Sequence, residues 1–329
     1  MWLANAPVIF IWLWFALRAR HLFFFSAANP AIETGGVLGE SKINILKRLP
    51  QEVVPKTLFI EAGSSLSEVL RAMDATGLNW PVIAKPNVGE RGFLVKKLRS
   101  EAELKAYLTA GPPDFLLQTY IDAPVELAVM HHRMPDTGHG RVTSICVKEN
   151  LTVTGDGQSS VRALMMQDLR SRLQLQRFEK EQPALLKLVP EKGQVLELEP
   201  IGNHCRGTKF LNGNHLIDDE IHNVFNRIAS QMEGIHYGRF DLRCQSVEAL
   251  RKGEFLVMEY NGVAAEPAHI YDPEMPVLEK YRSIYRHWEI IYRIYKAQRA
   301  RGVRPMNVSE ALAAVRNYRA YMARYKSKQ

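Results

Sequence analysis

Beyond residue 40, segments with the apolar pattern of strands alternate along the chain with segments that have the apolar spacing of helices. Six short apolar runs bounded by turn-forming or charged residues have the pattern of strands. These runs cover residues 81–86, 115–121, 125–131, 141–147, 240–243 and 255–260. The last two flank a charged connection, and we expect them to be neighbouring, paired strands.

Helical spacing and capping signals occur between these runs. Ser65 and Glu68, and again Ser100 and Glu103, have the spacing of a capping box, which satisfies the free amides at a helix start. Residues 164–178 predict one longer helix. Strands interleaved with helices predict a mixed architecture of the α/β or α+β class.

The N-terminal residues are strongly apolar. Residues 6–17 form one uninterrupted apolar run, whereas a membrane-spanning helix needs about 20 apolar residues. No Lys or Arg precedes the run, which argues against a secretory signal peptide. We therefore predict a buried or surface-docked helix, and the tryptophans at positions 2, 12 and 14 leave a membrane-surface role open.

The composition is that of an ordinary globular protein. Of the 329 residues, 46% are apolar and 24% are charged, which excludes a collagen, a disordered chain and a disulfide scaffold. The length predicts about two domains. The three cysteines are far apart, so neither a zinc site nor a disulfide framework is indicated. We therefore expect a reducing, cytoplasmic compartment.

The net charge of +8 is concentrated at the C-terminal end. Residues 280–329 contain 13 Lys or Arg and two acidic residues, whereas the rest of the chain contains 30 basic and 33 acidic ones. An aromatic stripe accompanies this charge at helical spacing, formed by Tyr281, Tyr285, Trp288, Tyr292 and Tyr295. We expect the stripe to pack on the domain; the alternative is a basic amphipathic helix on the anionic inner face of a membrane. No recognised motif accompanies the charge, so nucleic-acid binding is not expected.

A lysine and a glycine-containing turn close the first predicted strand. After Lys85, two glycines, Gly89 and Gly92, flank Arg91 and let backbone amides approach an anion. This arrangement suits a polyphosphate, although no Gly-Lys-Ser/Thr follows as in a P-loop. Taken alone, the segment is better explained as a structural turn.

The next predicted strand offers groups for a nucleoside. Residues 118–121, which include Gln118, Tyr120 and Ile121, present backbone groups that can bind an adenine. Glu126 follows a few residues later and can bind ribose hydroxyls. The alternative is a core strand followed by a solvated glutamate.

Carboxylate and amide side chains gather on the predicted strand pair. Asp241 lies near the start of one strand, and Glu259 and Asn261 alternate on one face of the next. Three oxygen ligands from paired strands suit a hard cation such as Mg²⁺ bound together with phosphate. A structural acid paired with Arg239 or Arg243 explains any single one of these residues but explains the set poorly.

In this order, the elements over residues 42–268 resemble the ATP-grasp superfamily, and within it the D-alanine–D-alanine ligases and the ATP-binding domain of cyanophycin synthetase. The resemblance implies an α+β ATP-grasp fold that binds ATP and Mg²⁺, with Mn²⁺ as an alternative metal. We expect an apolar N-terminal segment (1–41), an ATP-grasp domain (42–276) and a basic helical extension (277–329).

The resemblance also implies roles for individual residues. Phosphates would be held by Lys42, by Lys85 and by the turn formed by Gly89, Arg91 and Gly92. The adenine-binding linker would be Gln118 to Ile121, where Gln118 replaces the family's usual glutamate, and Glu126 would bind the ribose. The metal ligands would be Asp241, Glu259 and Asn261, and Arg239 matches the arginine before the aspartate.

The chain departs from D-alanine–D-alanine ligases in two places. Only 41 residues precede Lys42, and they match no part of the larger N-terminal domain of those ligases. This segment contains Asn29-Pro30, Gly35-Gly36 and Glu40-Ser41. Residues 262–269 replace the Pro-Gly turn that shapes the acceptor pocket, so we do not expect D-alanine as the substrate.

Two further loops carry candidate groups. Residues 155–157, Gly-Asp-Gly, resemble a segment of cyanophycin synthetase, and Ser159 or Ser160 can cap the next helix; the segment is either structural or borders the active site. In residues 202–209, Arg206 and Lys209 can hold an acyl phosphate or the γ-phosphate, unless the loop is simply solvated. Cys205 is not expected to be a nucleophile, because the family forms no covalent enzyme intermediate.

These assignments predict a ligase with Arg239, Lys209 and Arg206 in catalytic roles. ATP would phosphorylate a small-molecule or peptide carboxylate, and an amine or thiol would attack the acyl phosphate to give ADP and phosphate. One alternative phosphorylates or adenylates without ligation. The other is a regulatory nucleotide-binding protein without catalysis, peripherally associated with the membrane. The sequence leaves a homodimer open.

Overall fold

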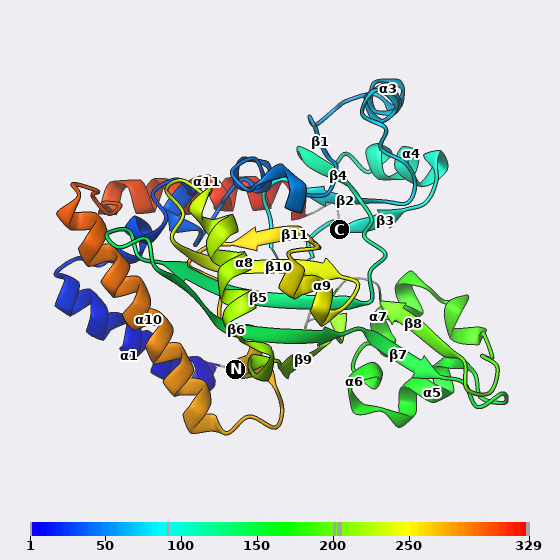
Figure 1. Cartoon of the computed structure of the whole chain (residues 1–329). Coiled ribbons are helices and arrows are strands. Elements are labelled where there is room, and N and C mark those ends of the chain that lie inside the picture. Colours follow the sequence, from blue (N-terminus) through cyan, green and yellow to red (C-terminus); the bar gives the residue numbers. More distant parts are fainter. Residues whose placement is uncertain (1, 91, 200–201, 203–205, 327–329) are drawn as a thin grey trace. The chain divides into compact units, whose positions relative to one another are not determined.

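The computed structural model describes residues 2–90, 92–199, 202 and 206–326. The chain divides into two compact units (Figure 1). The first unit contains residues 1–146 and 212–329, and the second contains residues 147–211. Both combine helices with antiparallel strands, so the predicted α+β class is confirmed.

A four-stranded antiparallel sheet lies in the first unit, with strand order β1-β4-β2-β3. Its strands are β1 (Thr57–Ile60), β2 (Val82–Pro86), β3 (Lys96–Leu98) and β4 (Phe115–Thr119). Helices α3 (Leu66–Thr76) and α4 (Glu101–Thr109) share a hydrophobic core with it. The capping box at Ser65 and Glu68 is confirmed. Ser100 caps α4, but the Glu103 carboxylate accepts from the amide of Arg99 rather than from Ser100.

The second sheet has the strand order β11-β10-β5-β6-β9. Its strands are β5 (Val125–Arg133), β6 (Gly140–Glu149), β9 (Lys209–Asn212), β10 (Tyr237–Cys244) and β11 (Phe255–Asn261). The chain leaves the first unit within β6 and returns within β9. β10 and β11 pair antiparallel, as predicted, and helices α8 (Asp219–Ser230) and α9 (Val247–Lys252) accompany them.

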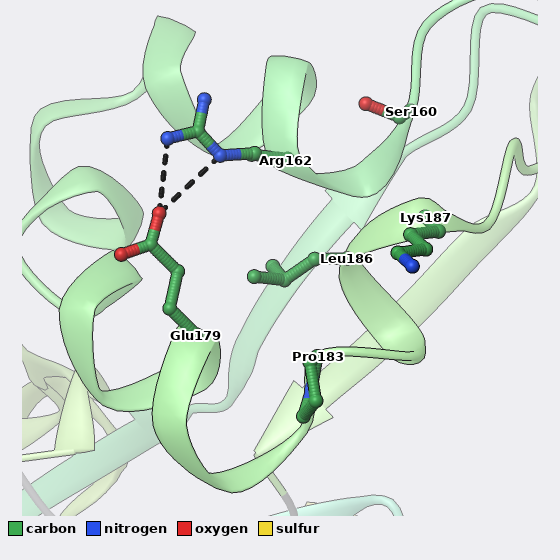
Figure 2. A pocket seen from close by; sticks show the side chains of 6 residues that line it. All are labelled: Ser160, Arg162, Glu179, Pro183, Leu186 and Lys187. Atoms are coloured by element: carbon green, nitrogen blue, oxygen red, sulfur yellow. Dashed lines mark hydrogen bonds and ion pairs between the residues drawn. The ribbon is translucent and has the colours of Figure 1, made fainter.

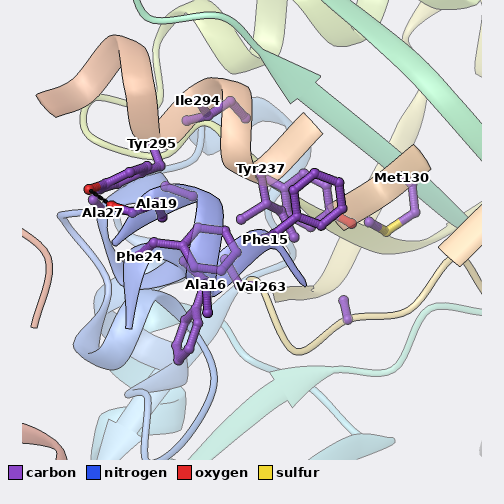
Figure 3. Packing of buried hydrophobic residues seen from close by; sticks show 14 residues of the cluster. Phe15, Ala16, Ala19, Phe24, Ala27, Met130, Tyr237, Val263, Ile294 and Tyr295 are labelled. Atoms are coloured by element: carbon purple, nitrogen blue, oxygen red, sulfur yellow. Dashed lines mark hydrogen bonds between the residues drawn. The ribbon is translucent and has the colours of Figure 1, made fainter. Parts of the chain in front are cut away.

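Three long helices come from the two ends of the chain. They are α1 (Trp2–Ala19), α10 (Val277–Ala300) and α11 (Val308–Lys326). In Figure 1, α1 in blue lies beside α10 in orange, and the Phe15 ring is 5.3 Å from that of Tyr285 and 5.5 Å from that of Tyr292. Figure 3 shows Phe15, Phe24 and Tyr295 in the same buried cluster. The predictions of a docked N-terminal helix and of a packed aromatic stripe are therefore confirmed for these residues.

The second unit contains a two-stranded sheet of β7 (Leu151–Thr154) and β8 (Val195–Glu199). The prediction of one helix over residues 164–178 is wrong, because the chain forms α5 (Val161–Gln167), α6 (Leu169–Arg172) and α7 (Leu175–Glu181). Asp168 has extended backbone angles and its side chain accepts from the Ser171 amide, so it ends one helix and caps the next.

Short helical segments complete the fold. They are η1 (Phe24–Ala28), η2 (Glu33–Gly35), α2 (Lys42–Leu46), η3 (Gln51–Val53), η4 (Leu185–Lys187), η6 (Asn214–Leu216) and η7 (Ala268–Tyr271). Every helix in the described part of the chain falls short of the length or the hydrophobicity that a membrane crossing demands.

Candidate functional site

The pairing of β10 with β11 places four predicted site residues on one face of the sheet. Asp241 is the direct partner of Glu259, and Arg239 is the direct partner of Asn261. Directly paired residues point to the same side, and so do residues two apart on one strand. The two carboxylates, the amide and the guanidinium therefore share one surface, as the sequence analysis expected for the metal ligands.

Asp241 is buried and held by Arg239. Arg239 Nε donates to Asp241 Oδ1 at 2.7 Å, and Arg239 Nη2 donates to Oδ2 at 3.2 Å. Arg239 Nη1 also donates to the carbonyl oxygen of Glu266 at 3.1 Å. The sequence left open that Asp241 is paired with an arginine, and in the structure it is paired with Arg239. This pairing also fixes the carboxylate in place at the sheet surface.

Glu259 and Asn261 keep capacity for further partners. The Glu259 side chain is 35% exposed, and its Oε1 lies 3.3 Å from Lys42 Nζ. The Asn261 side-chain amide nitrogen is buried and, among the residues that the structure describes, has no hydrogen-bond partner. A buried polar atom without a partner costs free energy unless a ligand or water satisfies it. Two carboxylates and an amide oxygen are ligand types that suit Mg²⁺, whereas the unpartnered Asn261 nitrogen can only donate a hydrogen bond, as to a phosphate oxygen.

In the described part of the chain, no group of three or more His, Cys, Asp or Glu side chains is arranged to hold a metal. The predicted set contributes only two such residues, because its third member is the amide of Asn261. The metal assignment for Asp241, Glu259 and Asn261 therefore stays a prediction.

Two lysines converge on the end of β11 from different elements. Lys42 is the first residue of α2 and donates to the carbonyl of Gly89, in addition to its contact with Glu259. Lys85, on β2, donates to Met258 O at 2.7 Å and to Gln118 Oε1 at 2.9 Å. Burial lowers the pKa of Lys85 to about 8, against the opposing effect of the nearby Glu259 charge.

A register shift explains why the Met258 carbonyl is available to Lys85. Asp241 pairs with Glu259 but the next residue, Leu242, pairs with Val257, so Met258 is the additional residue of a β-bulge. A bulged residue leaves the regular ladder, and its carbonyl can accept from a side chain. The bulge thus connects the four-stranded sheet to β11 next to Glu259.

The turn after Lys85 is fastened to α2. The Asn87 carbonyl oxygen accepts from the Lys42 amide at 3.0 Å, and Asn87 Oδ1 accepts from the Ile43 amide at 3.0 Å. Gly89 and Gly92 have φ angles of 144° and 74°, which glycine adopts without strain. Arg91 lies outside the described residues. The turn and Lys42 are therefore held together, as a shared phosphate site requires.

The predicted nucleoside-binding residues are engaged with protein groups. Gln118 Nε2 donates to Thr57 Oγ1 at 2.9 Å, so the Gln118 amide positions Lys85 from a buried strand. Glu126 is 5% exposed and accepts two hydrogen bonds from Arg243, at 2.7 and 2.9 Å. Glu126 is therefore not the solvated glutamate that the sequence analysis gave as the alternative.

The linker after β4 contacts the same arginine. The Ile121 carbonyl accepts from Arg243 Nη1 at 3.1 Å. The Tyr120 ring lies 3.2 Å from Lys97 Nζ, with its centroid 5.8 Å from the Arg243 guanidinium carbon. The roles predicted for Gln118, Tyr120, Ile121 and Glu126 stay predictions, and Arg243 is added as a residue that contacts the last three.

Arg206 and Lys209 belong to the second unit. Arg206 Nη1 donates to Glu199 Oε2 at 3.1 Å, and Arg177 Nη1 lies 2.8 Å from the same oxygen. Lys209 is the first residue of β9. Glu199 is 2% exposed, so this pairing compensates a buried carboxylate. The catalytic roles predicted for Arg206 and Lys209 stay predictions, and Cys205 lies outside the described residues.

The Gly-Asp-Gly segment is a locally closed turn in the second unit. Asp156 Oδ1 accepts from the amides of Gln158 and Ser159 at 2.8 and 2.6 Å, and Ser160 caps α5. A Cβ on Gly155 would lie 2.2 Å from the Glu191 carbonyl oxygen, so only glycine fits there. These contacts are those of a structural turn, one of the two roles considered for this segment.

The segment that precedes Lys42 borders the site, although no role was predicted for it. Asn29 is fully buried; its Oδ1 accepts from the His236 and Tyr237 amides, and its Nδ2 donates to Tyr237 O and Gly35 O. A Cβ on Gly36 would lie 2.5 Å from Gly262 Cα. Asn29 and the glycine pair thus attach this segment to both strands that carry the acidic residues.

Glu40 is a site residue that sequence reasoning missed. It is half-buried, and burial raises its pKa; its own backbone hydrogen bond and the Lys42 charge oppose this, and the charges of Glu259 and Glu90 add to it. The only signal in the sequence was the unassigned Glu40-Ser41 pair directly before the predicted phosphate-binding lysine. Glu40 adds a third acidic side chain near Glu259.

Two cavities of similar volume accompany this fold. One of about 410 Å³ lies in the second unit between Ser160, Glu179 and Lys187 (Figure 2), and none of its lining residues was predicted as a site residue. The other, of about 400 Å³, lies in the first unit beside Val263 to Pro267, a segment that begins two residues after Asn261.

No protein-family model matches the sequence, and no curated protein matches it either. Three solved structures have a similar backbone. A bifunctional glutathione synthetase from Pasteurella multocida is 17% identical, with a TM-score of 0.38; the match covers 74% of this chain and 36% of the synthetase. The VanG D-Ala:D-Ser ligase from Enterococcus faecalis is 12% identical, with a TM-score of 0.42 and coverage of 83% and 62%. A D-alanine–D-alanine ligase from Bacillus anthracis is 12% identical, with a TM-score of 0.43 and coverage of 79% and 68%.

The chain spans about a third of the first of these proteins and less than two thirds of the second. At identities of 12–17%, the likeness concerns the backbone alone.

Proposed function

We propose that the protein is an ATP- and Mg²⁺-dependent ligase of the ATP-grasp type, which joins a carboxylate to an amine or a thiol. One observation carries this proposal. Lys42 and Lys85 approach the end of β11 from α2 and β2, within 3.3 Å of Glu259 and 2.7 Å of Met258 O, where Asp241 and Glu259 are paired across two strands. Two cations beside two carboxylates suit a polyphosphate with its metal.

The residues divide into groups with different tasks. Lys42, Lys85 and the turn through Gly92 would bind the ATP phosphates, and Gln118 holds Lys85 in position. Asp241, Glu259 and Asn261 would hold Mg²⁺, which supplies charge neutralisation at the transferring phosphoryl group. Arg239 reaches the carbonyl of Glu266 and would bind the oxyanion that forms when the acyl group is attacked.

The reaction would proceed in two balanced steps. A carboxylate oxygen attacks the γ-phosphorus, the bond from that phosphorus to the bridging oxygen breaks, and ADP leaves. The amine or thiol then attacks the acyl carbon, phosphate leaves with the electron pair of the C–O bond, and the nucleophile loses a proton. Both steps place negative charge next to the lysines and Arg239, which lowers the barrier for each.

Release of ADP tests the proposal. Purified protein is incubated with ATP, MgCl₂, pools of carboxylates, and hydroxylamine as a small general nucleophile. We expect Asp241→Asn and Glu259→Gln to reduce turnover about a hundredfold or more, because each removes charge stabilisation worth several kcal/mol. Glu254→Gln, an exposed glutamate just before β11, is the matched control and should keep full turnover.

The outcomes separate the proposal from its competitors. Turnover that is insensitive to both substitutions would remove the metal assignment. A stable phosphorylated product without consumption of hydroxylamine would indicate a kinase. Tight ATP binding without hydrolysis in any pool would indicate a regulatory nucleotide-binding protein. Attachment to an anionic membrane surface and formation of a homodimer stay predictions.

A further inference from the structure

The cavity beside Val263 to Pro267 has an almost entirely apolar wall. It encloses about 400 Å³, which lies within the range of small-molecule sites. Its walls come from α1, η1, the segment after β11 and α10. The lining includes Val8, Ile9, Trp12, Ile284, Trp288 and Ile291. Ile9 lines the cavity and is also 49% exposed, so the cavity opens at the protein surface.

This cavity adjoins the proposed reaction centre. Its wall includes Val263 to Pro267, a segment that begins two residues after the candidate metal ligand Asn261. Arg239, which binds Asp241, donates to the backbone carbonyl of Glu266 in the same wall. The cavity and Arg239 therefore contact the same short segment, with Glu266 common to both.

The polar side chains that line the cavity already have hydrogen-bond partners in the protein. Tyr237 Oη and His287 Nδ1 lie 2.9 Å apart, and both side chains are buried. Burial lowers the pKa of His287 to about 3, so the imidazole is neutral at physiological pH. Glu266 is half-buried and accepts from the Tyr271 hydroxyl. The cavity thus presents little unpaired polarity to a bound molecule.

We propose that this cavity binds the apolar body of the carboxylate substrate, which makes that substrate an amphiphilic acid with an aliphatic chain. The proposal rests on the ligase function proposed above and names its substrate class. A small polar amino acid would leave the apolar walls unfilled. An aliphatic chain fills them and places its carboxylate at the polar end, next to Arg239.

Calorimetric titration with straight-chain acids tests the proposal without any chemistry. Butanoate, hexanoate, octanoate and decanoate are titrated into the full chain in the absence of nucleotide. We expect Kd to fall about fourfold for each added methylene until the cavity is full, because each buried CH₂ contributes a constant increment. Equal Kd values for butanoate and decanoate would overturn the proposal.

Substitutions locate the binding. Ile284→Phe and Ala264→Leu each add volume to the cavity wall. Ile284 is buried and Ala264 is exposed, so the Ala264 variant should fold even if the Ile284 variant does not. Each should weaken decanoate binding at least tenfold and leave butanoate unchanged. Leu278→Phe, an 80% exposed position on the same helix as Ile284, is the matched control and should bind decanoate normally. Decanoate binding that is unchanged in both cavity variants would place it elsewhere and overturn the proposal.

A second readout separates this inference from the ligase function. With ATP, MgCl₂ and hydroxylamine, we expect ADP release to be greatest for the acid that binds most tightly. If decanoate binds as expected but releases no ADP, the cavity assignment holds and the ligase function fails. If ADP is released equally with acetate and decanoate, the ligase function holds and the substrate class is wrong.

Discussion

Lys85 gives a pH dependence that can be measured before any substrate is known. Lys85 is 7% exposed, and burial lowers the pKa of its amine to about 8 from the ordinary 10.5. One pH unit above this value, about one tenth of the molecules carry the charge. If this charge binds ATP phosphates, the affinity for ATP should be nearly constant up to pH 7.5 and should fall about tenfold per unit above pH 8.

Titration of Lys85 does not itself destabilise the fold over the same pH range. Between pH 8 and 10.5 the unfolded chain binds the proton more tightly than the folded chain does, so Lys85 makes the protein more stable as the pH rises through this window. A fluorescent ATP analogue titrated from pH 6.5 to 9.5 measures the affinity, and circular dichroism verifies folding at each pH.

Variants isolate the contribution of Lys85. Lys85→Met should lose about ten- to hundredfold in affinity at pH 7, because it removes a charge-assisted interaction, and its remaining affinity should not change near pH 8. Lys96→Met, at an exposed position on β3, should retain the wild-type profile. A flat wild-type profile, or a folded Lys85→Met protein with unchanged affinity, would refute the reasoning.

Three predictions concern stability. Gly262→Ala should cost about 1–3 kcal/mol and reduce ADP release, because its Cβ would lie 2.6 Å from the Gly35 carbonyl oxygen and 2.7 Å from Gly36 Cα, directly after Asn261. Acidification should destabilise the protein through His287, since its pKa is near 6.5 unfolded and about 3 folded: stability is lost as the pH falls below 6.5, by about 1.4 kcal/mol per pH unit. Breaking the buried Glu126–Arg243 pair with Arg243→Met should cost about 3–5 kcal/mol in urea unfolding, because the buried Glu126 carboxylate loses the guanidinium that donates two hydrogen bonds to it.

Each of these has its own control. Gly302→Ala, at a φ of 85° in open space, should lose about 1–2 kcal/mol without affecting ADP release; equal effects of the two glycine variants on turnover would argue against the contact with Gly36. In His287→Asn, the free energy of unfolding should depend less steeply on pH, by about 1.4 kcal/mol per pH unit, the value that corresponds to one proton. An Arg243→Met variant that loses less than 1 kcal/mol would show that the ion pair is not desolvated.

Local signals in the sequence were sufficient for most strands and for part of the site. Apolar runs predicted β10 and β11 as a pair of strands. The two strands are close together along the chain, and their antiparallel pairing brings Asp241 opposite Glu259. The helix predicted over 164–178 failed because Asp168 can cap a helix as well as continue one.

Contacts between distant residues could not be predicted from local patterns. Asn29 is hydrogen-bonded to Tyr237, 208 positions away, and no local pattern around either residue predicts this contact. The same holds for the bulge at Met258, which depends on the register of two strands. The cavity also escaped prediction, since its walls come from both ends of the chain.

The packing of α1 against α10 has a consequence for synthesis on the ribosome. The inner face of α1, with Phe15 fully buried, is covered by residues near Tyr285 and Tyr292. Those residues are made more than 260 positions later, which at 5–20 residues per second is a delay on the order of 10 to 50 s. During this time the apolar helix is outside the ribosome without its native partner. The nascent chain should therefore depend on a chaperone or a lipid surface that shields α1 until α10 emerges.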